Sequence, residues 1–182
     1  LRHRNFRLFF VGQGVSMIGT WVLQVAMGWL VYRLTNSAWL LGVVAFCGSA
    51  GILVLGTFAG VIADRVNRRR AIFTTQALMA LQAVVLAFLA VTQVVQPWQL
   101  IVLALWLGTV TAFDITLRQS LYVHLVGDRA DLPNAIALNS FLVNAARVVG
   151  PALAGVLLAL TTEALCFALN ALSFVAVFVA LA

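Results

Sequence analysis

Gly60-Val61-Ile62-Ala63-Asp64-Arg65-Val66-Asn67-Arg68-Arg69-Arg70 is the stretch of sequence that decides the fold. It joins two long apolar runs, one ending near Ala63 and the other starting near Ala71. Because an acid and several arginines cannot lie in hydrocarbon, the stretch is predicted to be a charged turn at a membrane surface. A connection this short forms a tight helical hairpin, so the two flanking helices are expected to run antiparallel and in contact.

Small and turn-forming residues refine this hairpin. Gly56 and Gly60 lie four residues apart on one face of the first helix, which predicts close approach of a neighbouring helix there. Asn67 lies in the middle of the turn, where it is expected to tolerate a left-handed backbone.

The rest of the chain repeats the same pattern of long apolar runs. Of its 182 residues, 64% are hydrophobic and only 9% are charged, which excludes an ordinary soluble domain. Each run is long enough to cross a bilayer, and the first is too long for a cleaved signal peptide. The sequence therefore predicts an all-α membrane protein with spans at about 8–32, 38–63, 71–93, 98–123, 135–160 and 164–182.

The basic residues follow the alternation of the spans. Arginines precede span one, follow span two and follow span four, whereas the opposite side carries Arg33, Glu163 and little else. This asymmetry predicts a multi-pass protein of the cell membrane with a cytoplasmic N-terminus. It also explains the net charge of +6 without a nucleic-acid partner.

The opening stretch resembles motif A of the major facilitator superfamily, Gly-x-Leu-Ala-Asp-Arg-x-Gly-Arg-Lys. Ile62, Asn67 and Arg69 stand where that pattern has Leu, Gly and Lys. The resemblance implies that 1–182 is a single domain, the N-terminal six-helix half of a twelve-helix transporter, built as two three-helix repeats. It implies a role in a gating charge network against the C-terminal half for the motif A residues Gly60, Asp64, Arg65, Arg68 and Arg69.

Polar residues mark the spans that are expected to surround a cavity. Span one carries a stripe of Gln13, Ser16, Thr20 and Gln24 at helical spacing, and buried amides facing lipid would be unsatisfied. Spans one, four and five, which carry polar stripes, are predicted to be central, and spans three and six to face lipid. In the family the first and fourth helices of each half line the cavity. Trp21, Trp29 and Tyr32 include candidate membrane-interface anchors.

Ionisable residues deep in spans four and five are the candidate substrate or proton sites. Asp114 and Arg118 are spaced for an intrahelical pair, which leaves open a purely structural role. Asn144 and Arg147 lie at similar depth on span five, and Arg147 has no acid on its own helix. We therefore expect Asp114 to lie close enough to Arg147 to interact directly or through water.

Two further stretches bear on the branch of the superfamily. Residues 113–120 with 132–135 resemble exporters of enterobactin and macrolides, although Thr116 stands where that branch has Pro. Gly150, Pro151 and Gly155 resemble in part the Gly-Pro-x-x-Gly-Gly motif C of exporters, and a proline inside a helix predicts a kink that acts as a hinge. Asp131 or Asn134 is expected to cap span five.

The function expected from these features is secondary transport, not enzymatic catalysis. Gly48-Ser49-Ala50-Gly51 lacks the spacing of a nucleophile elbow, and neither histidine is placed as its base. Cys47 and Cys166 have no metal-site spacing, so no metal or cofactor is expected. The resemblance implies export of drug-like or siderophore-like molecules in exchange for protons, with a proton site in the other half equally possible. A non-transporting sensor or assembly module on the same scaffold remains open, and the chain is expected to be a fragment at both ends.

Overall fold

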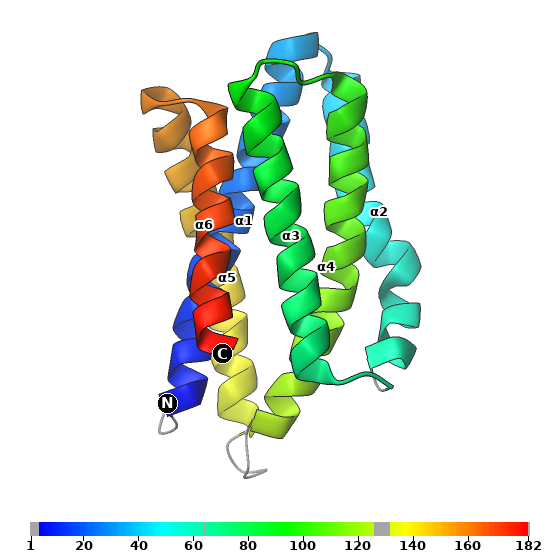
Figure 1. Ribbon diagram of the computed structural model, residues 1–182, viewed down its shortest axis with the longest axis vertical. Helices are drawn as coiled ribbons and strands as arrows, with labels where there is room; N and C mark the ends of the chain where they lie inside the picture. Colours follow the sequence, from blue (N-terminus) through cyan, green and yellow to red (C-terminus); the bar gives the residue numbers. More distant parts are fainter. Residues whose placement is uncertain (1–3, 64, 126–131, 182) are drawn as a thin grey trace.

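The computed structural model describes the backbone of residues 4–63, 65–125 and 132–181, and side chains within 10–56, 58–63, 65–119, 134, 136–175 and 177–178. The described residues form six helices: α1 (Arg4–Thr35), α2 (Ala38–Ala63), α3 (Arg68–Val91), α4 (Pro97–Leu125), α5 (Leu132–Leu160) and α6 (Glu163–Leu181). Figure 1 shows them as an up-and-down bundle. The predicted number, order and approximate limits of the helices are therefore confirmed.

The helices meet the length and composition expected of membrane spans. Five of them, α1 to α5, are long and apolar enough to cross a bilayer, and the assessed part of α6 is a shorter apolar stretch, Glu163–Val175. The chain reverses direction sharply between them. Asn36 takes a left-handed backbone with φ of 49° after α1, and Gln93 does the same with φ of 56° after α3.

The prediction for Asn67 was wrong in its geometry. Asn67 has φ of −67° and ψ of 105°, an extended conformation, and is the N-cap of α3. Its side-chain oxygen accepts a hydrogen bond of 3.2 Å from the backbone N–H of Arg70. The capping bond satisfies one of the free amides at the start of α3, so an N-cap rather than a left-handed turn explains Asn67.

The cap predicted for α5 is also revised. The helix begins at Leu132, so Asn134 lies inside its first turn and is not the cap. Asp131, the other candidate, lies outside the described residues.

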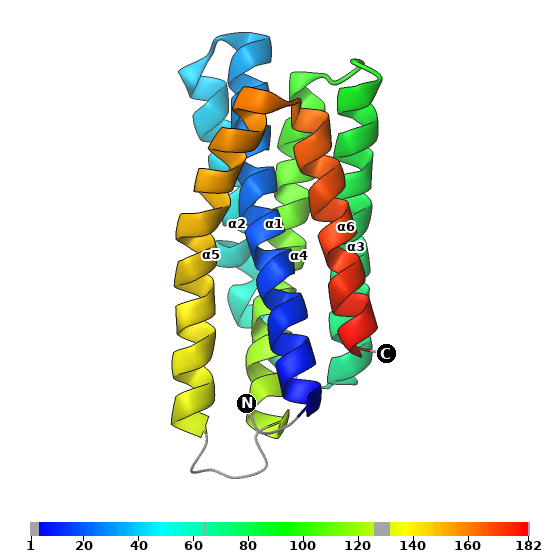
Figure 2. The same ribbon diagram turned by 90° about the vertical axis from the view of Figure 1, so that its left-hand side faces the viewer.

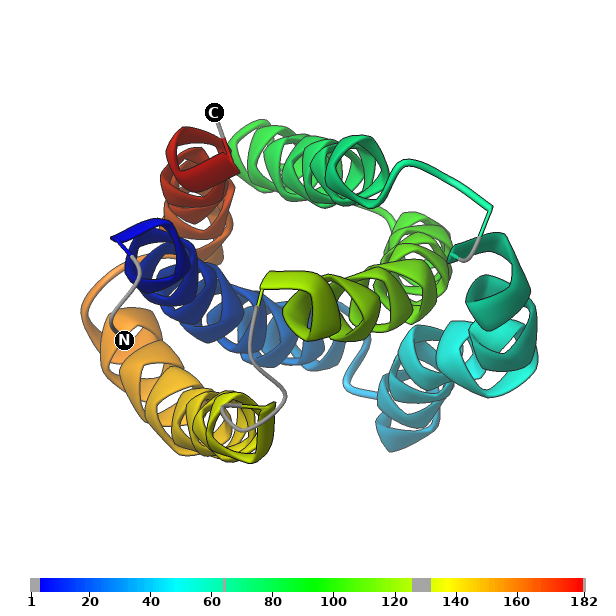
Figure 3. The ribbon, with the colours of Figure 1, turned by 90° about the horizontal axis from the view of Figure 1, so that it is seen from below.

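The packing of the helices repeats itself when α1, α2 and α3 are exchanged with α4, α5 and α6. α2 packs against α4 as α5 packs against α1; α3 packs against α4 as α6 packs against α1; and α3 and α6 pack against each other. Seen from below, α1 and α4 run through the middle, with α3 and α6 on one side and α5 and α2 on the other (Figure 3). Figure 2 shows α1 between α5 and α6. This exchange symmetry is the arrangement expected of two three-helix repeats.

Burial differs between the helices. Within the chain, 44% of the α1 and α4 spans is buried, but only 17% of the α5 span and 11% of the α2 span. α5 therefore flanks α1 in this chain, and it still lines the cavity described below. α3 is 39% buried, because Thr75, Gln76 and Gln82 lie on a face that packs inside the bundle while Phe73 and Phe88 lie on the outer face.

The described basic residues at the helix ends gather mainly at one end of the bundle. The start of α1, the connection from α2 to α3, and the facing ends of α4 and α5 lie at the lower end of Figure 1. Arg65, Arg69 and Arg70 lie there and are exposed. At the opposite end, Arg33 of α1 forms an ion pair of 3.0 Å with Glu163 of α6. One end of the bundle is thus strongly basic.

Candidate functional site

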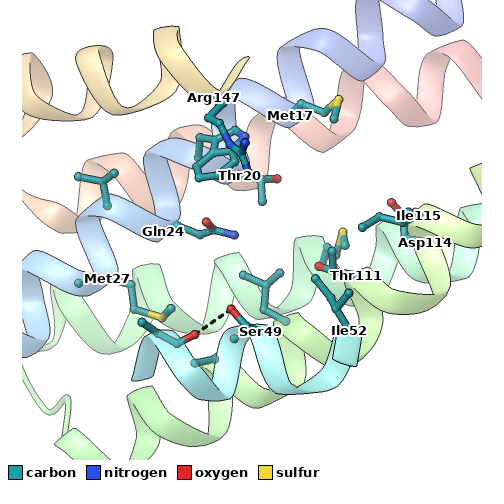
Figure 4. A pocket seen from close by; sticks show the side chains of 18 of the residues that line it. Met17, Thr20, Gln24, Met27, Ser49, Ile52, Thr111, Asp114, Ile115 and Arg147 are labelled. Carbon is teal, nitrogen blue, oxygen red and sulfur yellow. Dashed lines mark hydrogen bonds between the residues drawn. The ribbon is translucent and has the colours of Figure 1, made fainter. Parts of the chain in front are cut away.

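A cavity of about 690 Å³ lies between α1, α2, α4 and α5. Its polar lining comes from Ser16, Thr20 and Gln24 of α1, Ser49 of α2, Thr111, Asp114 and Arg118 of α4, and Arg147 of α5. Most of the remaining lining is apolar and includes Met17, Met27, Ile52 and Met79. Figure 4 shows Thr20, Gln24 and Arg147 on one wall and Ser49, Ile52 and Thr111 across from them.

Asp114 is the centre of a buried polar network on the α4 side of the cavity. Its carboxylate belongs to a residue that is 1% exposed. Thr75 Oγ1 donates to Asp114 Oδ1 at 2.7 Å, and Gln76 Nε2 donates to the same oxygen at 2.8 Å. The other oxygen, Oδ2, forms an ion pair with Arg118 on the next turn of α4. Both carboxylate oxygens are thus bound by donors, and the network ties α3 to α4.

Arg147 lies on the opposite wall, over an aromatic ring. The Cζ atom of Arg147 is 5.5 Å from the ring centroid of Trp21, a cation–π distance. Gly150, which lies on α5 like Arg147, packs against this part of α1. A Cβ placed on Gly150 would lie 2.3 Å from Trp21 Cβ and 3.2 Å from the carbonyl oxygen of Ile18. Without a side chain at Gly150, α5 packs directly against α1, and Arg147 reaches across Trp21.

No direct bond joins Asp114 and Arg147 among the interactions of the described residues, and the predicted contact through water stays a prediction. Asp114 binds α3 and Arg118, whereas the partner of Arg147 within the described part of the chain is Trp21. Both residues nevertheless line the same cavity. Thr75 and Gln76 of α3 supply direct donors for the carboxylate.

The polar stripe of α1 divides between the cavity and the protein interior. Thr20 and Gln24 line the cavity as predicted, and the Thr20 hydroxyl donates to the Ser16 carbonyl at 2.9 Å. Gln13 does not line it. Gln13 is fully buried, and neither its amide oxygen nor its amide nitrogen has a hydrogen-bond partner among the described residues.

Asn144 is a second correction to the predicted cavity set. It is exposed and is absent from the cavity lining, and its amide nitrogen donates to the Ser140 carbonyl of its own helix at 2.8 Å. Arg147, three residues later, is turned toward the cavity instead. The helical spacing alone did not separate the two positions.

Trp21 is a third correction. The sequence grouped it with interface anchors, but it lines the cavity beneath Arg147. Trp29 and Tyr32 are 52% and 45% exposed near the far end of α1, where an anchoring role still fits.

The motif A segment lies apart from the cavity. Gly60 has open space beside it, and so has Gly56, so among the described residues no helix crosses α2 at these two glycines and the close approach there stays a prediction. Arg65 is exposed, and Arg68 and Arg69 begin α3. Asp64 lies outside the described residues.

The close crossing lies one to two turns earlier in α2. A Cβ on Gly51 would lie 2.4 Å from the backbone carbon of Gly108, and a Cβ on Gly108 would lie 2.3 Å from the carbonyl oxygen of Gly48. α2 and α4 therefore touch backbone to backbone beside the cavity. α2 contains five glycines, each of which could permit a close crossing, so the sequence alone did not select this pair.

The candidate hinge lies inside a continuous helix. α5 runs from Leu132 to Leu160 through Pro151, and Pro151 lines the cavity. Proline has no N–H, so the carbonyl of Arg147 lacks its usual helical donor. Gly155 has open space around it.

No group of three or more metal-binding side chains occurs within the described ranges. The residues missed by sequence reasoning are instead Thr75 and Gln76 of α3, which bind Asp114. Gln76 stood out as a polar residue in an apolar span, and that was the available signal.

Comparison with known proteins gives consistent matches along the chain. A family described as transmembrane secretion effector matches residues 1–182. The staphyloferrin A transporter of Staphylococcus aureus is 32% identical over 154 residues, which cover 84% of this chain and 38% of that protein. Enterobactin exporters of Citrobacter koseri and Shigella boydii are 30% identical over 161 residues and 27% identical over 157 residues, each covering 86% of this chain and 38% of the relative. The chain thus spans less than half the length of these relatives.

Proposed function

Because the chain belongs to the transmembrane secretion effector family of the major facilitator superfamily, we propose that it forms half of a secondary transporter that exports a siderophore-like or drug-like small molecule. The observation that carries the proposal is the cavity between α1, α2, α4 and α5, whose lining combines apolar side chains with Thr20, Gln24 and Arg147. A mostly apolar lining with a few placed polar groups is typical of a small-molecule site. The names of the relatives support a siderophore as the substrate.

Transport proceeds by alternating access. A second six-helix half faces the cavity, the two halves rock about it, and the substrate is exposed to one side of the membrane at a time. The low burial of α2 and α5 within this chain, 11% and 17%, supports a role for their free faces in contacts with that second half. The basic end of the bundle faces the cytoplasm.

Motif A acts as a gate at that cytoplasmic end. Asp64 and Arg68 join a charge network with the second half, and the open space beside Gly56 and Gly60 leaves room for one of its helices. Replacing Asp64 with Asn in the complete protein is expected to slow export without lowering the amount inserted in the membrane. Export at the wild-type rate would remove motif A from the mechanism.

Protons drive the export. Asp114 is the one deeply placed acid of the described spans, but both its oxygens are held by donors, which fits an ion pair that stabilises the α3–α4 contact. The exchanged proton is therefore carried on a group of the second half.

The test is export by the complete protein reconstituted in liposomes with an imposed proton gradient. Radiolabelled enterobactin, staphyloferrin A and a macrolide are compared, with protein-free liposomes and a protonophore as controls. Gradient-dependent movement of one of the three compounds is expected. Equal movement in protein-free liposomes for all three would contradict the proposal and favour a non-transporting module.

A further inference from the structure

Arg147 differs from the other guanidinium group of the cavity in having no ion pair with an acid among the described residues. Arg118 forms its ion pair with Asp114, whereas the contact of Arg147 within the described residues is the neutral ring of Trp21. Two guanidinium groups and one carboxylate line the cavity, which leaves one uncompensated positive charge. That charge lies at Arg147.

The setting of Arg147 keeps its donors available. A guanidinium that lies over an aromatic ring is held by its face, so its N–H groups, which point outward in its own plane, remain free to bind a ligand. Because Gly150 has no side chain, the backbone of α5 packs directly against Trp21, and any Cβ at Gly150 would overlap Trp21. Figure 4 shows Arg147 above Thr20 and Gln24, which add a hydroxyl and an amide to the same wall.

We propose that Arg147 on Trp21 is an anion subsite of the cavity, which selects substrates that carry a carboxylate next to an apolar or aromatic body. Arg147 is exposed in this chain, and a carboxylate accepts two parallel, charge-assisted hydrogen bonds from its guanidinium fork. The apolar body packs on the facing lining, which includes Ile52 and Met79. The inference rests on the proposed function only in taking this cavity as the substrate site.

The test measures binding rather than transport. The complete protein in nanodiscs of neutral lipid is titrated with radiolabelled 2-naphthoate and with 2-naphthamide, its uncharged equivalent, and empty nanodiscs correct for partition. We expect naphthoate to bind about tenfold more tightly, roughly 1.4 kcal/mol. Arg147→Gln is expected to bring naphthoate down to the affinity of naphthamide and to leave the naphthamide affinity unchanged.

Two further variants separate a specific subsite from general charge. Arg147→Lys keeps the charge but loses the fork, so it is expected to retain part of the preference. Arg70→Gln removes one exposed positive charge far from the cavity and is expected to keep the full preference. The thermal unfolding midpoint of each variant is measured to confirm folding.

Equal binding of the two probes by the wild-type protein, binding of neither, or a preference that survives Arg147→Gln would overturn the inference. These results leave the export assay untouched, so a protein that exports without a charge preference refutes the anion subsite alone. Conversely, a charge preference that depends on Arg147 in a protein that exports nothing refutes the transport proposal alone.

Discussion

At the scale of single residues, the buried ion pair between Asp114 and Arg118 is the costliest group to disturb. The two side chains are 1% and 13% exposed, and the carboxylate also accepts from Thr75 and Gln76. Both charges are largely shielded from solvent within the chain, so removing one of them is costly. The contrast is the pair between Arg33 and Glu163, in which the arginine side chain is 57% exposed.

Asp114→Asn is therefore expected to lower the free energy of unfolding by about 3–5 kcal/mol, because it leaves the guanidinium of Arg118 buried without its counter-charge. The matched control is Glu163→Gln, which leaves behind the largely exposed Arg33 side chain and is expected to cost at most about 1 kcal/mol. Thermal unfolding of the complete protein, followed by tryptophan fluorescence in one detergent, compares the two. Equal effects would contradict the structural role of the Asp114 network.

The position of a site residue could be predicted from the sequence where its own helix determines it, and could not where neighbouring helices do. Asp114 and Arg118 follow from the spacing within α4, and Thr20 and Gln24 from a stripe on α1. The interior position of Gln13 and the outward position of Asn144 depend on neighbouring helices. The partners of Asp114 on α3 are 38 and 39 positions away in the chain, beyond the reach of any periodicity.

At the scale of helices, the boundaries were predictable because the hydrocarbon thickness fixes the length of an apolar run. The crossing points were not, since a glycine permits a close contact but does not require one. α2 contains Gly48, Gly51, Gly56 and Gly60, and the structure uses the first two against Gly108 of α4. The family resemblance, now established as membership, still did not fix this register.

Some glycines of α2 pack against α4 and others have open space beside them, and the two kinds give a paired prediction. Gly51→Ala puts a Cβ 2.4 Å from the backbone of Gly108, which forces the helices apart, and is expected to destabilise the protein by about 1–3 kcal/mol. Gly42→Ala meets no atom within 4 Å among the described residues and gains the better helix former, about 1 kcal/mol in a helix interior. The unfolding midpoints should therefore move in opposite directions relative to the wild type. A similar loss in both variants would show that the α2–α4 contact is not as close as described.

Pro151 gives a second prediction at this scale. Pro151→Ala restores a donor for the Arg147 carbonyl and stiffens α5 beside the cavity, so export is expected to slow or to become leaky to protons. The complete protein is assayed in liposomes for export and for passive proton flux, with the inserted amount measured in parallel. If both rates equal those of the wild type, the proline is a structural feature only.

At the scale of the whole molecule, the exchange symmetry explains why the cavity lies where it does. Each repeat contributes one central helix, α1 or α4, and one flanking helix, α2 or α5, and these four line the cavity. The sequence indicated the central helices through their polar stripes. It missed α2, because the wall that α2 provides is made of apolar residues and a single serine, Ser49, rather than of charged ones.

Access to this cavity from water is the property that distinguishes a transport path from a packed interior. In a complete protein whose Cys47 and Cys166 are replaced by alanine, cysteine is introduced at Ser49, which lines the cavity, or at Leu81, which is 51% exposed on the outer face of α3. A membrane-impermeant maleimide needs a hydrated thiol, so it is expected to label position 49 and not position 81, which faces lipid.

Cysteines at Arg70 and Gln93, at opposite ends of the bundle, report which side the reagent reaches. Alternating access predicts that position 49 is labelled from both sides, in intact cells and in inside-out vesicles, while Arg70→Cys reacts only in the vesicles and Gln93→Cys only in the cells. Labelling of position 49 from one side alone would contradict alternating access, and a reversed pattern at positions 70 and 93 would contradict the cytoplasmic N-terminus.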